Sequence, residues 1–137
     1  MKNEELKLAN CRKSKNREDV TAILKKSKQP LSAEDIYKTL LKKKKTLALS
    51  TVYRILDKLL EHHIIHETMK DGDKTLYEIS DNEHKHYMMC TECKKIIPLD
   101  LCPFREFENN ITKETGFTIT GHRFEIFGIC PECNSKK

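Results

Sequence analysis

Four cysteines are the residues whose types and spacing most clearly predict chemistry in this chain: Cys90, Cys93, Cys130 and Cys133. They form two Cys-x-x-Cys pairs, and the two-residue gap lets both sulfurs of a pair turn toward one point. Two such pairs offer four soft thiolates, which match the tetrahedral coordination of structural zinc. The alternatives are two disulfides or a redox dithiol. The pattern favours one structural zinc ion per chain.

The surrounding sequence disfavours both alternatives. The N-terminal residues are polar and charged rather than a secretory signal, and a redox motif needs only one Cys-x-x-Cys pair. We therefore expect a cytoplasmic protein in which Cys11 and Cys102 stay reduced unless they bind metal. The 36 residues between Cys93 and Cys130 must fold to bring the two pairs together. Residues 83–137 are few enough that a metal usually supplements the apolar core.

The excess positive charge lies entirely in the first part of the chain. Residues 1–82 carry 18 Lys and Arg against 13 Asp and Glu, whereas residues 83–137 carry 8 of each. A basic segment points to a polyanion, either nucleic acid or an anionic membrane surface. No uncharged run reaches the ~18 apolar residues of a membrane span, so we expect no membrane association.

Three short helices are predicted in this basic part. Apolar residues at helical spacing predict the first over 17–28, and Pro30 ends it. Ser32 is the predicted N-cap of the second helix, and the acidic residues after it suit the helix dipole. Ser50 is the N-cap candidate of the third helix, whose residues 52–60 have the strongest amphipathic pattern.

The polar face of the third helix resembles a DNA-reading surface. Ser50 and Thr51 begin it, and Tyr53 and Arg54 follow in the first turns. In a helix-turn-helix, Arg54 can pair with guanine, and Thr51 or Tyr53 can contact a thymine methyl group. The alternative is an ordinary three-helix bundle with a polar face. The basic excess favours nucleic acid, because phosphate contacts dominate its binding.

A β-hairpin is predicted directly after these helices. Runs 64–67 and 76–79 have strand-like composition, and Asp71-Gly72 marks the turn between them. A hairpin after a recognition helix makes the domain a winged helix, and Lys70 and Lys74 at its tip would face the phosphate backbone.

The remainder of the chain is predicted to be a small αβ domain. We place the winged helix at 1–80, a hinge at 81–83 and the αβ domain at 84–137, which gives an α+β fold. In the αβ domain the sequence predicts strands at 86–89 and 95–99, a helix from Pro103 to Gly116, and a long strand over 117–127 that is bent near Gly121.

This organisation resembles the ferric uptake regulator family of bacterial metal-responsive repressors. The resemblance is carried by the sequences at 32–37, 49–54 and 120–128, and the segments 100–103 and 121–126 look most like the zinc-sensing branch. It implies a homodimer joined through the C-terminal domains that binds an A/T-rich palindromic DNA operator. Metal binding would shift the dimers toward the DNA-competent arrangement.

The resemblance also implies roles for individual residues. Tyr53 and Arg54 match the base-contacting pair, and Arg12 lies near the position from which a basic residue reaches the minor groove. For a second, sensing metal site, the matching residues and their possible substitutes are His84, His86, His122, Cys102 and Glu106. The usual carboxylate position of that site holds Arg105.

An interdomain site of the family is only partly matched. Glu78 matches one ligand, but the other positions hold Pro30, Lys85 and Tyr87. The site is either absent or rebuilt from His62, His63 or His66. Lone histidines are more often hydrogen-bonded surface or core residues than ligands, and Cys102 could equally be a small buried apolar residue.

The sequence therefore predicts a zinc-responsive transcriptional repressor with a second, regulatory divalent metal in addition to structural zinc. The alternatives are an iron- or peroxide-responsive repressor and a constitutive zinc-ribbon interaction module. An enzyme is disfavoured because four cysteine ligands leave no open coordination position, and no nucleophile-elbow, paired-carboxylate or phosphate-loop motif is present. No small organic substrate is expected.

Overall fold

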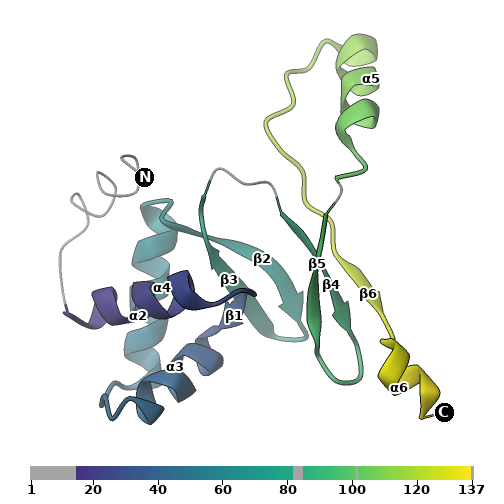
Figure 1. The fold of residues 1–137 in the computed structure, drawn as a ribbon. Helices are drawn as coiled ribbons and strands as arrows, with labels where there is room; N and C mark the ends of the chain where they lie inside the picture. Colours follow the sequence, from purple (N-terminus) through teal and green to yellow (C-terminus); the bar gives the residue numbers. More distant parts are fainter. Residues whose placement is uncertain (1–14, 82–84, 101, 137) are drawn as a thin grey trace. The chain divides into compact units, whose positions relative to one another are not determined.

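The computed structural model describes residues 15–81, 85–100 and 102–136 (Figure 1). The chain divides into two compact units, Met1–Asp81 and Asn82–Lys137. Both units combine helices with a small sheet, so the predicted α+β class is confirmed. The predicted residues Cys11, Arg12 and His84 lie outside the described residues. The hinge at 81–83 stays a prediction.

Three helices form the first part of unit 1: α2 (Lys15–Lys26), α3 (Ala33–Lys42) and α4 (Leu49–Glu61). The predicted cap of α3 is confirmed. The backbone N–H of Asp35 donates to Ser32 Oγ, and the backbone N–H of Ser32 donates to Asp35 Oδ2, both at 3.1 Å. This reciprocal pair satisfies two backbone donors at the helix start.

The predicted cap of α4 is wrong. Ala48, not Ser50, is the N-cap, and no side chain caps the helix. The backbone N–H groups of Thr51 and Val52 donate to the Ala48 carbonyl at 3.0 and 3.2 Å. Leu49 packs against the core, and this apolar contact accompanies a helix start two residues before the polar cap candidate. Ser50 is exposed in the first turn.

The core of unit 1 lies where the three helices meet the sheet. Val20 of α2, Ile36 and Leu40 of α3, and Val52 and Leu56 of α4 are fully buried. Burial of each such side chain contributes about 1.5–3 kcal/mol relative to exposure. The helical periodicity of the sequence therefore identified the core-facing sides of all three helices.

The sheet of unit 1 contains β1 (Leu31–Ser32), β2 (Ile65–Asp71) and β3 (Lys74–Ile79), in the order β1-β3-β2. The predicted hairpin is β2–β3, which is antiparallel and turns at Gly72 with φ of 61°. Strand β1 is only two residues long, pairs with β3 and was not predicted. Such a short strand carries no alternation pattern that sequence could reveal.

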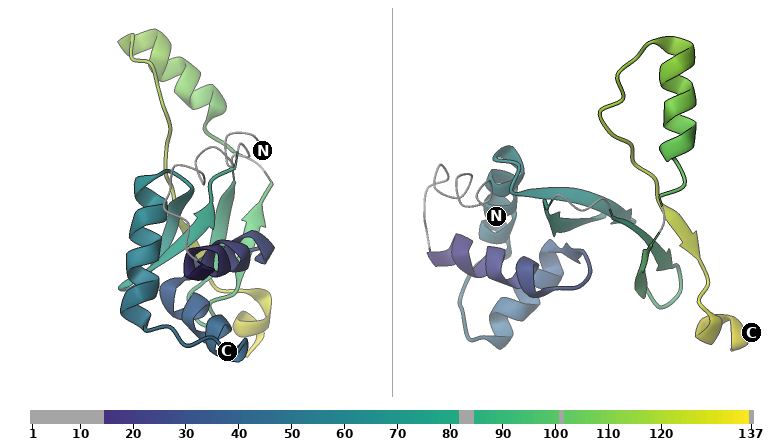
Figure 2. Two further views of the ribbon diagram at one scale, coloured as in Figure 1. Left: turned by 90° about the vertical axis from the view of Figure 1, so that its left-hand side faces the viewer. Right: turned by 45° about the horizontal axis from the view of Figure 1, so that its top comes forward.

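Unit 2 is built on β4 (His86–Cys90), β5 (Ile96–Leu99) and β6 (Ile126–Gly128). The order is β5-β4-β6, with β4 antiparallel to β5 and parallel to β6. Helix α5 (Arg105–Thr115) ends at Gly116 as predicted but begins two residues after Pro103. Its ribbon stands away from this sheet in Figures 1 and 2. A short helix, α6 (Pro131–Ser135), contains the last cysteine and was not predicted.

The predicted long strand over 117–127 is wrong. Residues 117–125 have no regular secondary structure, and β6 covers only the end of the predicted range. Within the described part of unit 2, the pairing of β6 with β4 is limited to Met88–Cys90 of β4. Phe117 is 74 % exposed, so the alternating apolar pattern of this segment does not reflect a strand that packs on its own unit.

Within residues 15–81, 85–100 and 102–136, no helix has both the length and the apolar character that crossing a membrane requires.

Candidate metal centres and DNA-binding surface

The four predicted cysteines converge in unit 2, and their sulfur atoms all lie within 4.8 Å of one another. Cys90 ends β4, and Cys93 follows in the turn before β5. Cys130 precedes α6 as its N-cap, and Cys133 lies within that helix. The Cys93 and Cys130 sulfurs are 3.7 Å apart, close to the ~3.8 Å that tetrahedral zinc with Zn–S bonds of about 2.3 Å requires.

Backbone N–H groups support the sulfur atoms of this cluster. Those of Cys93 and Cys130 donate to Cys90 Sγ at 3.5 and 3.3 Å, and these bonds lower the pKa of the Cys90 thiol to about 6. The pKa of the Cys133 thiol is raised to about 12. The largest cause is the hydrogen bond with the Cys130 side chain, and burial is the second. Without a cation the four sulfurs cannot all be thiolates at neutral pH, so the donor set suits a divalent ion.

A second cluster of possible ligands lies at the opposite end of β4. His86 begins the strand, Cys102 lies just before α5, and His122 lies in the irregular segment 117–125. Their ligand atoms lie within 4.8 Å of one another. His122 Nε2 is 3.1 Å from His86 Nε2 and 3.4 Å from Cys102 Sγ.

These separations also fit a metal ion. With Zn–N of about 2.0–2.1 Å and Zn–S of about 2.3 Å, tetrahedral geometry places two nitrogens ~3.3 Å apart and nitrogen from sulfur ~3.6 Å apart. The observed distances of 3.1 and 3.4 Å are slightly shorter. Three described residues supply three donors, which leaves a position for a further ligand.

Aromatic side chains surround the second cluster. The His86 and His122 rings are stacked with centroids 5.0 Å apart, and Phe124 lies 4.1 Å from His86. Phe104 lies 5.2 Å from His122 and 4.9 Å from Phe124. These rings limit the access of water to the imidazoles and restrict their orientation.

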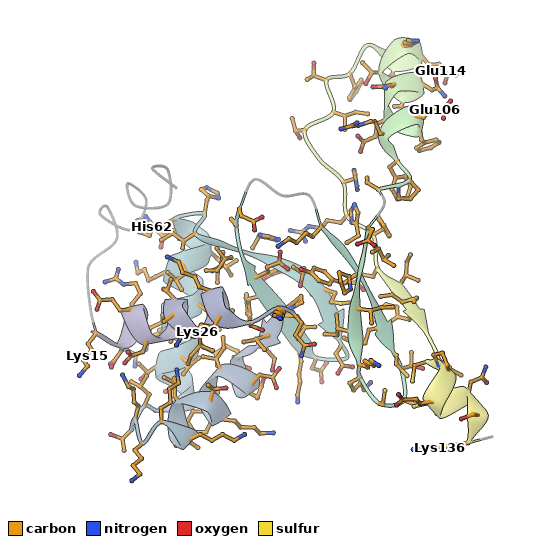
Figure 3. All side chains as sticks on the ribbon, viewed as in Figure 1. Lys15, Lys26, His62, Glu106, Glu114 and Lys136 are labelled. Carbon is orange, nitrogen blue, oxygen red and sulfur yellow. The ribbon has the colours of Figure 1, made fainter. Side chains whose placement is uncertain are left out.

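The carboxylate expected near this cluster comes from a different residue of α5. Glu106 is exposed and is not part of the cluster, whereas Glu108 is half-buried and its Oε1 contacts His122 Nδ1 (Glu106 is labelled in Figure 3). Glu108 was not among the residues predicted for this site. The signal that could have identified it is its position three residues after Arg105, on the same side of the helix.

Glu78 and the remaining candidate histidines belong to unit 1. Glu78 lies on β3, and its Oε2 atom is buried without a hydrogen-bond partner among the residues that the structure describes. His66 pairs with Glu78 across the hairpin, and its Nδ1 lies 3.0 Å from Ser80 Oγ. His62 is the C-cap of α4, and His63 follows it with φ of 59°.

The predicted DNA-contacting residues lie on two elements of unit 1. On α4, Ser50 and Arg54 are exposed, Tyr53 is 40 % exposed and Thr51 is half-buried. On the wing, Lys70 near the end of β2 and Lys74 at the start of β3 are both exposed. Their exposure is compatible with a ligand approaching α4 and the hairpin tip.

A hydrogen bond orders one of these side chains. The Tyr53 hydroxyl donates to Glu34 Oε1 of α3 at 2.8 Å. This bond is the main reason why the pKa of Glu34 is lowered and that of Tyr53 is raised. Glu34 therefore holds the Tyr53 ring in place on the exposed face of α4.

A winged-helix unit followed by an αβ unit with one four-cysteine cluster and one Cys/His cluster defines a metal-binding winged-helix protein. The model of the Ferric uptake regulator family matches residues 8–127. The chain therefore belongs to this family, whose members are transcription regulators and not enzymes.

Individual relatives support the same membership. The ferric uptake regulation protein of Campylobacter jejuni is 36% identical over 61 residues, 44% of this chain and 39% of that protein. The peroxide-responsive repressor of Staphylococcus aureus is 39% identical over 56 residues, 40% of this chain and 38% of that protein. The matched region thus spans about two fifths of the length of these curated relatives.

The fold also matches solved structures. The structure of the Helicobacter pylori ferric uptake regulator, described as having three functional metal binding sites, superposes with a TM-score of 0.79 at 30% identity. The alignment covers 95% of this chain and 87% of that one. The winged helix followed by a metal-binding αβ unit is therefore shared along nearly the whole chain.

Proposed function

We propose that this protein is a zinc-responsive transcriptional repressor that binds A/T-rich palindromic DNA as a metal-loaded homodimer. The observation that carries the proposal is the convergence of His86, Cys102 and His122. A thiolate with two imidazoles suits zinc, whereas iron and manganese sites more often contain carboxylates and water. His84 is the proposed fourth ligand, and the four-cysteine cluster holds the structural zinc.

The DNA-binding part of the proposal rests on unit 1. Tyr53 and Arg54 extend from α4 toward solvent, and Lys70 and Lys74 flank the wing turn. The excess positive charge of the chain lies in residues 1–82. We assign Arg54 and Tyr53 to base contacts and the two lysines, together with Arg12, to the phosphate backbone and minor groove.

The homodimer is supported by apolar side chains that unit 2 leaves exposed. Those with at least 38% exposure are Ile97, Phe107, Phe117, Ile126, Phe127 and Ile129. Exposed apolar side chains on a small domain indicate a partner surface. A second copy of unit 2 would cover them and bring two winged helices to the two halves of a palindrome.

The sensing residues come from three separate segments of unit 2. His86 belongs to the sheet, Cys102 to the approach to α5 and His122 to the irregular segment after α5. A bound divalent ion supplies the positive charge that lets a thiolate and two imidazoles remain together. With the ion bound, these three ligands hold their segments in one arrangement, and the population of DNA-competent dimers rises.

A titration of DNA binding with zinc tests the proposal. Protein with one zinc per chain is mixed with a fluorescent A/T-rich palindromic duplex obtained by in vitro selection, and anisotropy is followed against buffered free zinc. We expect binding to rise steeply well above the zinc concentration that fills the four-cysteine site. The proposal fails if the one-zinc protein already binds the duplex as tightly as fully loaded protein.

An iron- or peroxide-responsive repressor is the second candidate, and similarity to the C. jejuni and S. aureus proteins favours it. Footprinting with ferrous iron, manganese or zinc at equal occupancy of the second site would then show operator protection with iron or manganese and not with zinc. Peroxide treatment of the iron-loaded protein would also add oxygen to His84 or His86, which mass spectrometry detects.

The third candidate is a constitutive zinc-ribbon interaction module, and one variant distinguishes it from the repressor. In His84→Ala/His86→Ala/His122→Ala protein the four cysteines remain, so the fold keeps its structural ion. The repressor proposal requires loss of the zinc-dependent increase in DNA affinity. Full DNA binding by this variant would instead establish a module that senses nothing.

A further inference from the structure

Glu108 connects helix α5 to the Cys/His cluster. It lies in the first turn of α5, where its backbone N–H donates to the Phe104 carbonyl at 2.8 Å. Its carboxylate Oε1 contacts His122 Nδ1, and the two side chains are 26 % and 19 % exposed. The contact is thus largely removed from solvent on both sides.

The two nitrogens of His122 face different partners. Nε2 is directed at the possible metal position, 3.1 Å from His86 Nε2 and 3.4 Å from Cys102 Sγ. Nδ1 is directed at Glu108. A carboxylate can accept a hydrogen bond only from a ring nitrogen that carries a proton, so this pairing assigns the proton to Nδ1 and leaves the Nε2 lone pair for a ligand.

We propose that Glu108 is the positioning residue of the second metal centre. It holds His122 in the tautomer and ring orientation that metal binding needs, and it ties α5 to the bound ion. Metal-ligating histidines commonly donate their other N–H to a carboxylate, which fixes the ring and raises its basicity. This inference rests on the proposed metal-sensing function of the same cluster.

Glu108 acts through His122 and not on the ion itself. The two imidazole nitrogens point away from each other across the ring, so a carboxylate bonded to Nδ1 cannot also reach an ion at Nε2. The Phe104 ring, 5.2 Å from the His122 ring, contributes to the same fixation from another side. The residue therefore replaces neither Cys102 nor His86 as a ligand.

The connection matters because α5 has little other attachment. None of its residues is buried, and its ribbon stands apart from the sheet of its unit (Figure 2). The Glu108–His122 contact is a polar link from this helix toward the cluster. An ion that immobilises His122 would through Glu108 also immobilise α5, which carries the exposed Phe107.

Substitutions at two carboxylates of the same helix test the proposal. Glu108→Ala and Glu108→Gln are compared with Glu106→Ala and Glu106→Gln, matched controls at an exposed position outside the cluster. Each protein is prepared with one zinc per chain, and the affinity for a second zinc ion is measured by competition with a chromophoric chelator. Circular dichroism confirms that each variant is folded.

We expect Glu108→Ala to weaken the second site roughly 10- to 100-fold. Glu108→Gln should lose less, because its amide oxygen still accepts from Nδ1 although the charge is gone. The Glu106 variants should stay within ~2-fold of the wild type. Equal affinities for Glu108→Ala and wild type, or equal losses at positions 106 and 108, would overturn the proposal.

Cobalt spectroscopy separates a positioning role from direct ligation. Co²⁺ in the second site of Glu108→Gln should keep the thiolate charge-transfer band of Cys102 and tetrahedral d–d bands of wild-type intensity. A change of coordination number in this variant would make Glu108 a ligand and overturn the positioning role. Amide exchange of α5 should slow on filling the second site in wild type but not in Glu108→Ala.

The outcomes also separate this inference from the proposed function. A second site that depends on Glu108 while DNA binding ignores zinc would leave the positioning role standing and remove the sensing function. Zinc-dependent DNA binding that is equally strong in Glu108→Ala would leave the sensing function standing and remove the positioning role. A wild-type protein that binds no second ion would overturn both.

Discussion

Unit 1 and unit 2 differ in how much apolar side chain each buries in its own interior. Unit 1 has a core of fully buried aliphatic side chains, among them Ile36, Leu40 and Leu56, packed between three helices and a hairpin. In the described part of unit 2 the buried apolar residues are confined to β4, where Tyr87, Met89 and Cys90 are buried. Neither of its helices buries a residue.

Unit 2 instead concentrates possible metal ligands at both ends of one strand. His86 begins β4 and belongs to the Cys/His cluster, and Cys90 ends it and belongs to the four-cysteine cluster. Four residue steps of about 3.3 Å separate them along the strand. Unit 1 therefore has the apolar core to fold by the hydrophobic effect alone, whereas we expect the stability of unit 2 to depend on bound ions and on the proposed dimer contact.

Loss of the four-cysteine ion should have the largest effect and should be confined to unit 2. Structural zinc contributes on the order of 10–16 kcal/mol of binding free energy that becomes folding free energy. We expect Cys93→Ser to remove amide-exchange protection from β4, β5 and β6 while α3 and α4 keep theirs. Cys102→Ser is the control, since it changes only the other cluster. Unchanged protection in unit 2 of Cys93→Ser would contradict the comparison.

Truncation of one apolar side chain in each unit should change the free energy of unfolding by very different amounts. Leu56 is fully buried, so Leu56→Ala should lower the free energy of unfolding of unit 1 by about 2–5 kcal/mol in urea denaturation. Phe107 is 58 % exposed in the single chain, so Phe107→Ala should change the free energy of unfolding of unit 2 by less than ~0.5 kcal/mol at concentrations where the chain is monomeric, and should weaken the proposed dimer instead. If the two substitutions destabilised the chain equally, the contrast between the units would be wrong.

Within unit 1, the helix and the wing should contribute differently to DNA binding. Arg54→Ala should cost roughly 1–3 kcal/mol on the selected duplex and relax sequence preference, because Arg54 is assigned to a base. Lys70→Ala should weaken binding to all duplexes and reduce the salt slope by about 1. Anisotropy titrations at several salt concentrations measure both. A sequence-independent loss for Arg54→Ala would assign it to phosphate.

The Glu34–Tyr53 hydrogen bond should give the smallest effect. Its contribution to stability should stay below about 1 kcal/mol in a double-mutant cycle of Glu34→Gln and Tyr53→Phe, because the hydrogen bond is exposed to solvent. The bond lowers the pKa of Glu34 from 4.5, so its contribution is present above pH 4.5 and is lost as pH falls through the lower folded value. Wild-type and Glu34→Gln urea midpoints should therefore converge in acid.

Much of this molecule could be predicted because the determining patterns are local. Apolar spacing identified the core faces of α2, α3 and α4, Asp71-Gly72 identified the hairpin turn, and Cys-x-x-Cys spacing identified the residues of the four-cysteine cluster. The helix faces and the turn have a geometry set by neighbours within a few residues, and the two Cys-x-x-Cys pairs identify the ligands by their local spacing, although the fold of the 36 residues between them is what joins the pairs.

Other features depended on contacts between distant segments. Ser50 is a good cap by residue type, but core packing of Leu49 starts α4 at an earlier position. The alternation over 117–127 suggested a strand, but only its last residues find a neighbour in β4. Local preference could not reveal either outcome.

The carboxylate beside His122 shows the same division most clearly. Glu106 and Glu108 are two residues apart and equal in sequence terms, but each residue of a helix turns by about 100°, so their side chains leave α5 in nearly opposite directions. From the sequence, the family resemblance suggested Glu106 as a possible acidic group of the site that contains Cys102 and His122. Only the tertiary structure, by orienting α5, decided that Glu108 is the one that reaches the imidazole.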